Sequence, residues 1–98
     1  MSNFRTKFNT RDDNEPDLVA VCERMGVNWF EGGPLDGWVN VLGWIPVEIK
    51  NPDGKDEYRP SQVKFIKLCH DRGWPVWTWR FEQDVIELIN ARRRAKAA

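Results

Sequence analysis

Apolar residues recur along this chain with two different periods, one typical of helices and one typical of strands. Three segments carry apolar side chains three and four positions apart, which predicts amphipathic helices at residues 13–26, 60–73 and 81–89. Gly26 and Gly73 follow the first two runs, as expected for residues that end helices. The apolar stripes consist of Leu18, Val19, Cys22 and Met25, then Phe65, Ile66 and Cys69, and finally Phe81, Val85, Leu88 and Ile89.

Between these helices lie segments rich in aromatic and β-branched residues, which favour strands. The strands are predicted at residues 27–30, 38–42, 45–49 and 76–79. Gly43 separates the second from the third strand and predicts a hairpin. Pro46 has no amide donor and predicts an edge position or an irregular start for the third strand. The element order is therefore αβββαβα, an α/β arrangement.

Length and composition fit a small domain of ordinary type. The 98 residues suffice for one domain, assigned to residues 12–98, and the polar residues 1–11 are expected to form a flexible arm. No apolar segment is long enough for a membrane span and no signal peptide is evident, so a cytoplasmic location is expected. Cys22 and Cys69 are then expected to be reduced thiols in the core. His70 is the single histidine, which excludes a multi-histidine zinc site.

Two polar residues lie on the apolar stripes of predicted helices. Glu15 precedes Leu18 by three positions and Cys22 by seven, which places it on the buried face of the first helix. Gln62 has the same relation to the stripe of the second helix. The structural alternatives are a first-turn glutamate favoured by the helix dipole and a glutamine that caps the helix.

Glu48, Lys50 and Asp36 are three further candidates. Glu48 and Lys50 are two positions apart in a strand and share the face opposite the apolar residues 45, 47 and 49. A solvent-facing ion pair on a half-exposed sheet would explain these two residues equally well. Asp36 follows a Gly-Pro turn, where aspartate commonly serves turn geometry alone.

The three carboxylates together predict a metal site. If Glu15, Asp36 and Glu48 were brought close, they would repel one another unless a cation lay between them. Mg²⁺ and Mn²⁺ prefer oxygen ligands of this kind. Such an ion polarises a phosphate and lowers the pKa of a bound water, and Lys50 beside it would stabilise the charge of the transition state. This combination is typical of phosphodiester hydrolysis.

Asp36, the Glu48-Ile49-Lys50 run and the element order together resemble the PD-(D/E)XK nuclease superfamily, and more narrowly the short stand-alone VRR-NUC nucleases of phages and bacteria. The resemblance implies a restriction-endonuclease-like core with a mixed sheet flanked by helices. The chain departs from the family pattern in two places, because Leu35 separates proline from aspartate and Arg59 replaces a serine or threonine. The matching segments are Asn14-Glu15, Pro34-Leu35-Asp36, Val47-Glu48-Ile49-Lys50 and Arg59-Pro60-Ser61-Gln62.

The resemblance also implies roles for individual residues. Lys50 would be the catalytic base or charge stabiliser, and Gln62 would orient the site or contact the scissile strand. The ligands of Mg²⁺ or Mn²⁺ would be the carboxylates of Glu15, Asp36 and Glu48 and the backbone carbonyl of Ile49.

The predicted function is metal-dependent hydrolysis of DNA by an endonuclease. The resemblance implies a homodimer that cuts four-way (Holliday) junctions in a bacterial cell, with a phage as a possible source of the gene. Net charge is zero, whereas nucleic-acid-binding domains usually carry a basic excess. Contact with DNA is therefore expected at local basic segments and not over the whole surface. The residues expected to make this contact are Lys55, Arg59 and Lys64. The alternatives are the same chemistry on flaps, nicks or single strands, and a non-catalytic DNA-binding protein with this fold.

Four tryptophans of the predicted strand regions have three open roles. Core packing is expected first, because large aromatic side chains are mostly buried. Contact with a second subunit and stacking on exposed bases are the alternatives. The four residues are Trp38, Trp44, Trp77 and Trp79.

Overall fold

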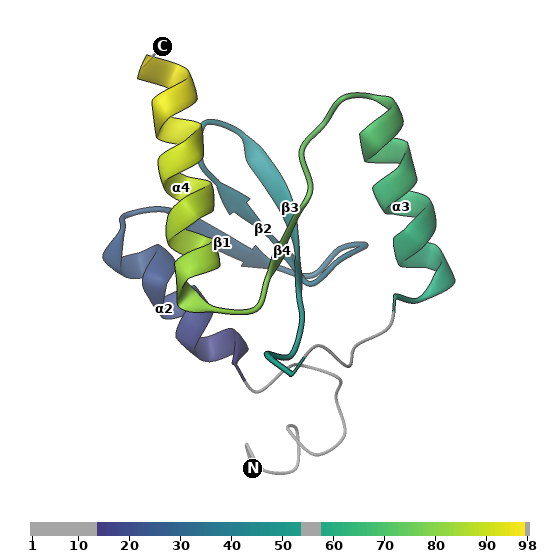
Figure 1. Cartoon of the computed structure of the whole chain (residues 1–98), viewed down its shortest axis with the longest axis horizontal. Helices are drawn as coiled ribbons and strands as arrows, with labels where there is room; N and C mark the ends of the chain where they lie inside the picture. The colour runs from purple at the N-terminus through teal and green to yellow at the C-terminus, as the bar shows by residue number, and fades with distance from the viewer. Residues whose placement is uncertain (1–13, 54–57, 98) are drawn as a thin grey trace.

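A four-stranded sheet lies between two layers of helices in the computed structural model, which describes residues 14–53 and 58–97 (Figure 1). The predicted arm at residues 1–11 and the predicted DNA contact Lys55 lie outside the described residues. The elements are α2 (Glu15–Arg24), β1 (Asn28–Glu31), β2 (Gly37–Asn40), β3 (Trp44–Ile49), α3 (Pro60–Asp71), β4 (Trp77–Trp79) and α4 (Glu82–Ala97).

The predicted order αβββαβα is confirmed, and the sheet is mixed. The strands follow the spatial order β1-β2-β3-β4; β1, β2 and β3 pair antiparallel, and β4 runs parallel to β3. A parallel pair needs a crossover connection, and α3 supplies it. Because β3 and β4 run in the same direction, the residues that follow Ile49 and Trp79 emerge at the same edge of the sheet.

One face of the sheet packs against α2 and α4 and forms the apolar core. Trp79 is completely buried there, with its ring centroid 5.5 Å from that of Trp29. A Cβ atom at Gly37 would collide with the Trp29 ring, so glycine at this position lets the ring lie across β2. The cluster comprises Leu18, Val21, Cys22, Val39, Val41, Ile45, Val47, Ile49, Trp79, Val85, Leu88 and Ile89.

The helix α3 lies on the opposite face of the sheet (Figure 1). Its apolar side chains are buried less completely than those of the core. Of its predicted stripe, Cys69 is buried, whereas Phe65 and Ile66 are half-buried. Both Cys69 and Cys22 are free thiols, as predicted. Nowhere in residues 14–53 and 58–97 is a helix both long and apolar enough to traverse a membrane.

Two details differ from the sequence pattern. Phe81 precedes α4 and is exposed, because the Asp84 carboxylate accepts hydrogen bonds from the amides of Arg80 and Phe81 and so defines the helix start. The strand that contains Pro46 is interior, with β2 on one side and β4 on the other. However, β4 pairs only with Val47–Ile49, so at Pro46 the strand β3 has β2 as its single neighbour.

Candidate active site

The face of the sheet that looks toward α3 carries the charged strand residues singled out in the sequence. Glu48 and Lys50 share this face with Thr78, which pairs with Glu48 across the parallel ladder. Glu48 is 3% exposed and Lys50 is 4% exposed. The alternative of a solvent-facing ion pair is therefore wrong, because both charged side chains are buried.

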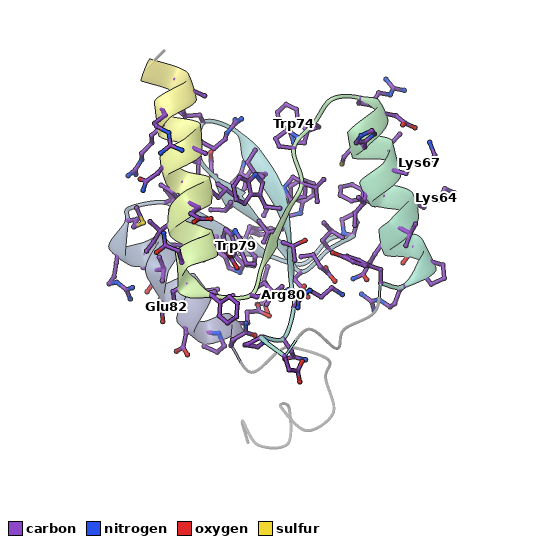
Figure 2. The ribbon with its side chains drawn as sticks, in the orientation of Figure 1. Lys64, Lys67, Trp74, Trp79, Arg80 and Glu82 are labelled. Carbon is purple, nitrogen blue, oxygen red and sulfur yellow. The ribbon has the colours of Figure 1, made fainter. Side chains whose placement is uncertain are left out.

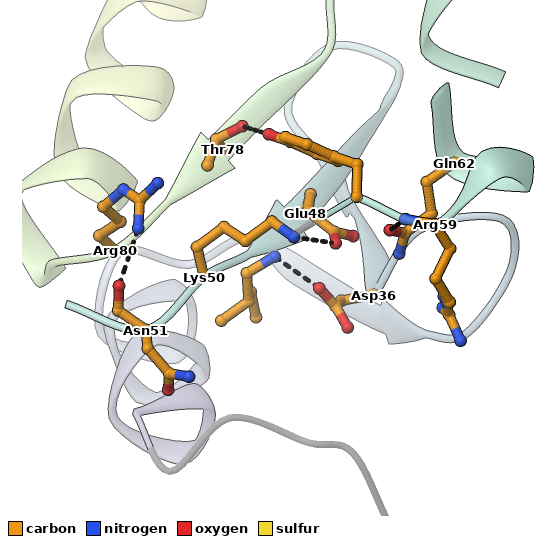
Figure 3. Close-up of polar contacts among 10 residues, drawn as sticks. Asp36, Glu48, Lys50, Asn51, Arg59, Gln62, Thr78 and Arg80 are labelled. Atoms are coloured by element: carbon orange, nitrogen blue, oxygen red, sulfur yellow. Dashed lines mark hydrogen bonds and ion pairs between the residues drawn. The ribbon is translucent and has the colours of Figure 1, made fainter. Parts of the chain in front are cut away.

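Lys50 is held between a carboxylate and an aromatic ring. Its Nζ lies 3.1 Å from Glu48 Oε2 and 4.1 Å from the centroid of the Tyr58 ring, a cation–π distance (Figure 3). The Tyr58 hydroxyl lies 3.2 Å from Thr78 Oγ1. Tyr58 therefore covers the lysine from the segment before α3, and its hydroxyl ties that segment to β4.

Asp36 lies in the turn that enters β2, as the sequence indicates. Its Oδ2 accepts a hydrogen bond from the Ile49 amide at 2.6 Å, and its own amide donates to the Val47 carbonyl at 3.2 Å. These two bonds fix the Asp36 carboxylate against the C-terminal half of β3 (Figure 3). The role of Asp36 thus extends beyond the geometry of the turn.

The Asp36 carboxylate is close enough to Glu48 to perturb the pKa of Glu48. Burial and the neighbouring Asp36 carboxylate raise the pKa of Glu48 from 4.5 to about 7, although Lys50 acts in the opposite direction. Glu48 Oε1 is buried and has no hydrogen-bond partner among the described residues. A buried oxygen without a donor is costly, and a cation beside it would remove both this cost and the repulsion.

Glu15 is buried, as its position on the stripe predicts, with 1% of its surface exposed. The preceding residue, Asn14, donates from Nδ2 to the carbonyls of Lys50 at 3.2 Å and Arg80 at 2.9 Å. The start of α2 is thereby tied to the ends of β3 and β4.

The expected convergence of three carboxylates is not met. Within the part of the chain that the structure describes, no three His, Cys, Asp or Glu side chains form a group that could hold a metal ion. Glu15 is the first residue of α2, whose Leu18, Val21 and Cys22 belong to the apolar core, whereas Glu48 shares the opposite face of the sheet with Thr78. Asp36 and Glu48 form the carboxylate pair, and the Ile49 backbone lies beside them.

Gln62 is buried at the start of α3 and has the capping contact that the structural alternative requires. Its Oε1 accepts a hydrogen bond from the backbone amide of Arg59 at 2.9 Å, and the backbone amide of Gln62 donates to the Arg59 carbonyl at 2.9 Å. Arg59 and Lys64, two of the predicted DNA contacts, are exposed at this end of α3 and along it. Figure 2 shows Lys64 on the helix that faces the charged side of the sheet.

Several residues that complete the site were not singled out by the sequence pattern. Arg80 donates from a guanidinium nitrogen to the Asn51 carbonyl at 2.8 Å and so joins the segment after Lys50 to the end of β4 (Figure 3). The parallel pairing of β3 and β4 was the available signal, because residues after two parallel strands meet at one edge. Tyr58 and Thr78 come from two different segments, and no local pattern marks them.

Comparison with protein-family models, with curated proteins and with solved structures finds no match to this chain. A functional proposal therefore rests on the residues of the site and on their arrangement.

Proposed function

We propose that this protein is a metal-dependent endodeoxyribonuclease of the PD-(D/E)XK type, with a restriction-endonuclease-like core similar to that of the stand-alone VRR-NUC nucleases. The supporting observation is the group formed by the buried side chains of Glu48 and Lys50, at the end of β3, and the half-buried Asp36 in the turn before β2. Two neighbouring carboxylates would repel the phosphates of DNA, so a protein that only binds DNA gains nothing from them. The same carboxylates are useful when a cation separates them from a phosphate.

The donors that would hold Mg²⁺ or Mn²⁺ are the carboxylates of Asp36 and Glu48 and the carbonyl of Ile49. This set fits the usual coordination of Mg²⁺, which binds one or two protein carboxylates and keeps several water ligands. When bound, the ion would polarise the phosphate and supply a nucleophilic water at neutral pH. The resemblance adds Glu15 as a third carboxylate, but Glu15 is left out of this donor set because the described residues contain no group of three carboxylates that could hold a metal ion.

The chain's own residues would orient the reaction and balance its charge. The Ile49 amide holds Asp36 in place before any substrate binds. Lys50 would stabilise the negative charge that develops on the phosphate, and burial strengthens this effect because little water screens it. Tyr58 limits where the Lys50 ammonium can move.

The experiment that tests this proposal is a cleavage assay with a matched lysine control. Labelled linear duplex, flap and four-way junction DNA are incubated with the protein and Mg²⁺, Mn²⁺ or EDTA. We expect cleavage with either metal, none in EDTA, and a loss of about 10²–10³-fold in rate for Lys50→Ala. Lys96→Ala, which removes an exposed lysine of α4, should cleave like wild type. Cleavage by Lys50→Ala at the wild-type rate, or no metal-dependent cleavage of any substrate, would contradict the proposal.

We also propose that the protein acts as a homodimer on four-way junctions. With zero net charge, its affinity for linear duplex should be modest. A branched substrate would contact Arg59 and Lys64 of two subunits at once, which raises the apparent affinity. Light scattering should then report a dimer, and opposing strands of a junction should be cut in pairs. A monomer that cuts flaps as readily as junctions would overturn this substrate and leave the nuclease proposal intact.

A further inference from the structure

Aromatic residues continue the charged face of the sheet away from the carboxylates. Trp38 lies two residues after Asp36 on β2, and its pairing partner Pro46 lies two residues before Glu48 on β3. Residues two apart share a face, and directly paired residues do too. Trp38 and Pro46 therefore lie one strand repeat from the carboxylate pair, and Phe30 of β1 pairs with Trp38 on the far side.

An open pocket of about 320 Å³ lies on this face, and it is here called the aromatic pocket. It is lined by the rings of Phe30, Trp38 and Trp44, the first residue of β3. The rings of Phe30 and Trp44 meet edge to face, with centroids 6.4 Å apart and an interplanar angle of 73°. Phe30 is 65% exposed and Trp44 is 43% exposed, although such side chains are usually buried. The volume lies at the lower end of the range of about 300–1,000 Å³ that is common for small-molecule sites.

The walls of the aromatic pocket are held in place before any ligand arrives. Trp38 packs edge to face on Phe65 of α3, with centroids 6.1 Å apart. The Trp44 carbonyl accepts a hydrogen bond from the indole of Trp74 at 3.3 Å, and Figure 2 shows Trp74 between α3 and α4. Arg92 donates to the carbonyl of Leu42 at 2.8 Å and so fixes the turn that precedes Trp44. A rigid aromatic surface binds a flat ligand with a small loss of conformational entropy.

We propose that the aromatic pocket binds an unpaired nucleobase of the same DNA strand whose phosphate lies at the carboxylate pair. This inference rests on the proposed nuclease function and deepens it. Proteins hold unpaired bases by stacking them on aromatic side chains, largely without regard to sequence. Trp44 lies four residues before Glu48, about 13 Å along a strand, so a base within a few nucleotides of the phosphate would reach it.

The surroundings of the aromatic pocket favour a base over a second copy of the chain. Polar residues border it on the same face: the paired Asn28 and Asn40 at one end and Asp36 at the other. A stable protein interface takes about 20–30 residues from each side, whereas the three rings that line the aromatic pocket match one flat ring. The exposed Asn28 amide can also hydrogen-bond the edge of a base.

The test separates bases from phosphates. Binding of a short labelled oligothymidylate and of an abasic oligomer of equal length is measured by fluorescence anisotropy in EDTA, where no cleavage interferes. Wild type should prefer the oligothymidylate by about 5- to 150-fold, because a stacked base contributes about 1–3 kcal/mol. Trp44→Ala should reduce this preference toward unity without changing the affinity for the abasic oligomer. Trp44→Phe should retain most of the preference.

Two further variants serve as a second test and as a control for base binding in the aromatic pocket. Phe30→Ala removes the most exposed ring of the aromatic pocket and should also weaken the preference, which keeps the test valid if Trp44→Ala folds poorly. Phe81→Ala removes an exposed ring that does not line the aromatic pocket and should bind like wild type.

The outcomes distinguish this inference from the nuclease proposal. Equal wild-type affinity for both oligomers, or a preference that survives in Trp44→Ala and Phe30→Ala, would overturn the base site even if DNA is cleaved. An intact preference combined with loss of a dimer in Trp44→Ala, seen by light scattering, would assign this face to a second copy instead. The absence of metal-dependent cleavage would count against the nuclease proposal alone, because this binding is measured without metal.

Discussion

Val47 and Glu48 are neighbours on β3 and are almost equally buried, yet they face opposite surroundings. Val47 points into the apolar core that α2 and α4 complete, where close packing determines stability. Glu48 points to the side of α3, beside a second carboxylate and a lysine. The alternation of a strand thus places an apolar face and a charged face one residue apart.

Burial therefore stabilises the fold on one face of β3 and destabilises it on the other. Removing apolar side chains from water stabilises the fold, whereas removing charges from water opposes it unless each charge is compensated. On the side of α3 the compensation is incomplete, because Glu48 Oε1 lacks a donor among the described residues. The predictions below test this contrast, from the largest expected effect to the smallest.

The first prediction compares two neighbours that lie on opposite faces. Ile45→Ala should lower the free energy of unfolding by about 2–5 kcal/mol, because it leaves a cavity in the core. Trp44→Ala, one residue earlier, should cost clearly less despite the larger side chain, because Trp44 is 43% exposed. Chemical denaturation of the two variants measures both losses. Equal losses would mean that the two faces do not differ in this way.

The second prediction separates activity from stability at Glu48. Glu48→Gln should lower the cleavage rate by about 10²–10³-fold. In EDTA at pH 8 the same variant should melt at a higher temperature than wild type, because the raised pKa of Glu48 means that its ionised form is disfavoured in the folded protein even with Lys50 beside it. Glu87→Gln, an exposed neutralisation on α4, serves as the control and should change neither quantity strongly. A Glu48→Gln variant that is both active and less stable would contradict the assignment.

The third prediction concerns pH. Between pH 4.5 and about 7 the folded protein holds a proton on Glu48 that the unfolded chain releases, because folding raises the pKa of this group from 4.5 to about 7. The Glu48 contribution to stability should therefore fall as pH rises from 4.5 to about 7 and stay level above that range. Mg²⁺ should restore stability mainly at the upper end, where the carboxylate is ionised.

The measurement is a series of thermal melts across this pH range, with Mg²⁺ or with EDTA. The difference between wild type and Glu48→Gln isolates the contribution of this carboxyl group from those of other titrating residues. If the difference in melting temperature between wild type and Glu48→Gln did not change with pH, the pKa of Glu48 would not be raised by folding.

The fourth prediction concerns Gln62, which has both a capping contact and a proposed role in the site. Gln62→Ala should lower the free energy of unfolding by about 1 kcal/mol, because the Arg59 amide loses its acceptor. Cleavage well below the melting temperature should also slow. Gln62→Glu keeps the acceptor and should recover the stability. A stability loss at an unchanged cleavage rate would leave Gln62 with the capping role alone.

The sequence was sufficient for the element order and for the two faces of β3. The alternation from residue 45 to residue 50 has the same period in the sequence and in the sheet, so Ile45 and Glu48 were assigned to the correct faces. The burial of Glu48 and Lys50 was not predictable in this way. It depends on Tyr58, which reaches Lys50 from a later segment, and local periodicity does not report such contacts.

The tryptophans and Glu15 show the same limit. Core packing was expected for both Trp79 and Trp44; Trp79 is fully buried, but Trp44 is 43% exposed. Both lie in strands rich in apolar residues, but Trp79 lies on the core face that α2 and α4 cover, whereas Trp44 lies on the face toward α3. Helical spacing correctly predicted that Glu15 is buried but not which side of the sheet its helix covers.

The hydrogen bonds from Asn14 to the carbonyls of Lys50 and Arg80 join residues 36 and 66 positions apart, which has a consequence for biosynthesis. Translation proceeds from the N-terminus, so a nascent chain that has already exposed Glu48 and Lys50 still lacks β4 and Arg80. It also lacks α4, whose Val85, Leu88 and Ile89 complete the core beneath the sheet. Domains generally fold as units once enough of the chain has left the ribosome. A ribosome-bound fragment would therefore carry the carboxylates without the assembled site, and activity would begin only after most of the chain has been made.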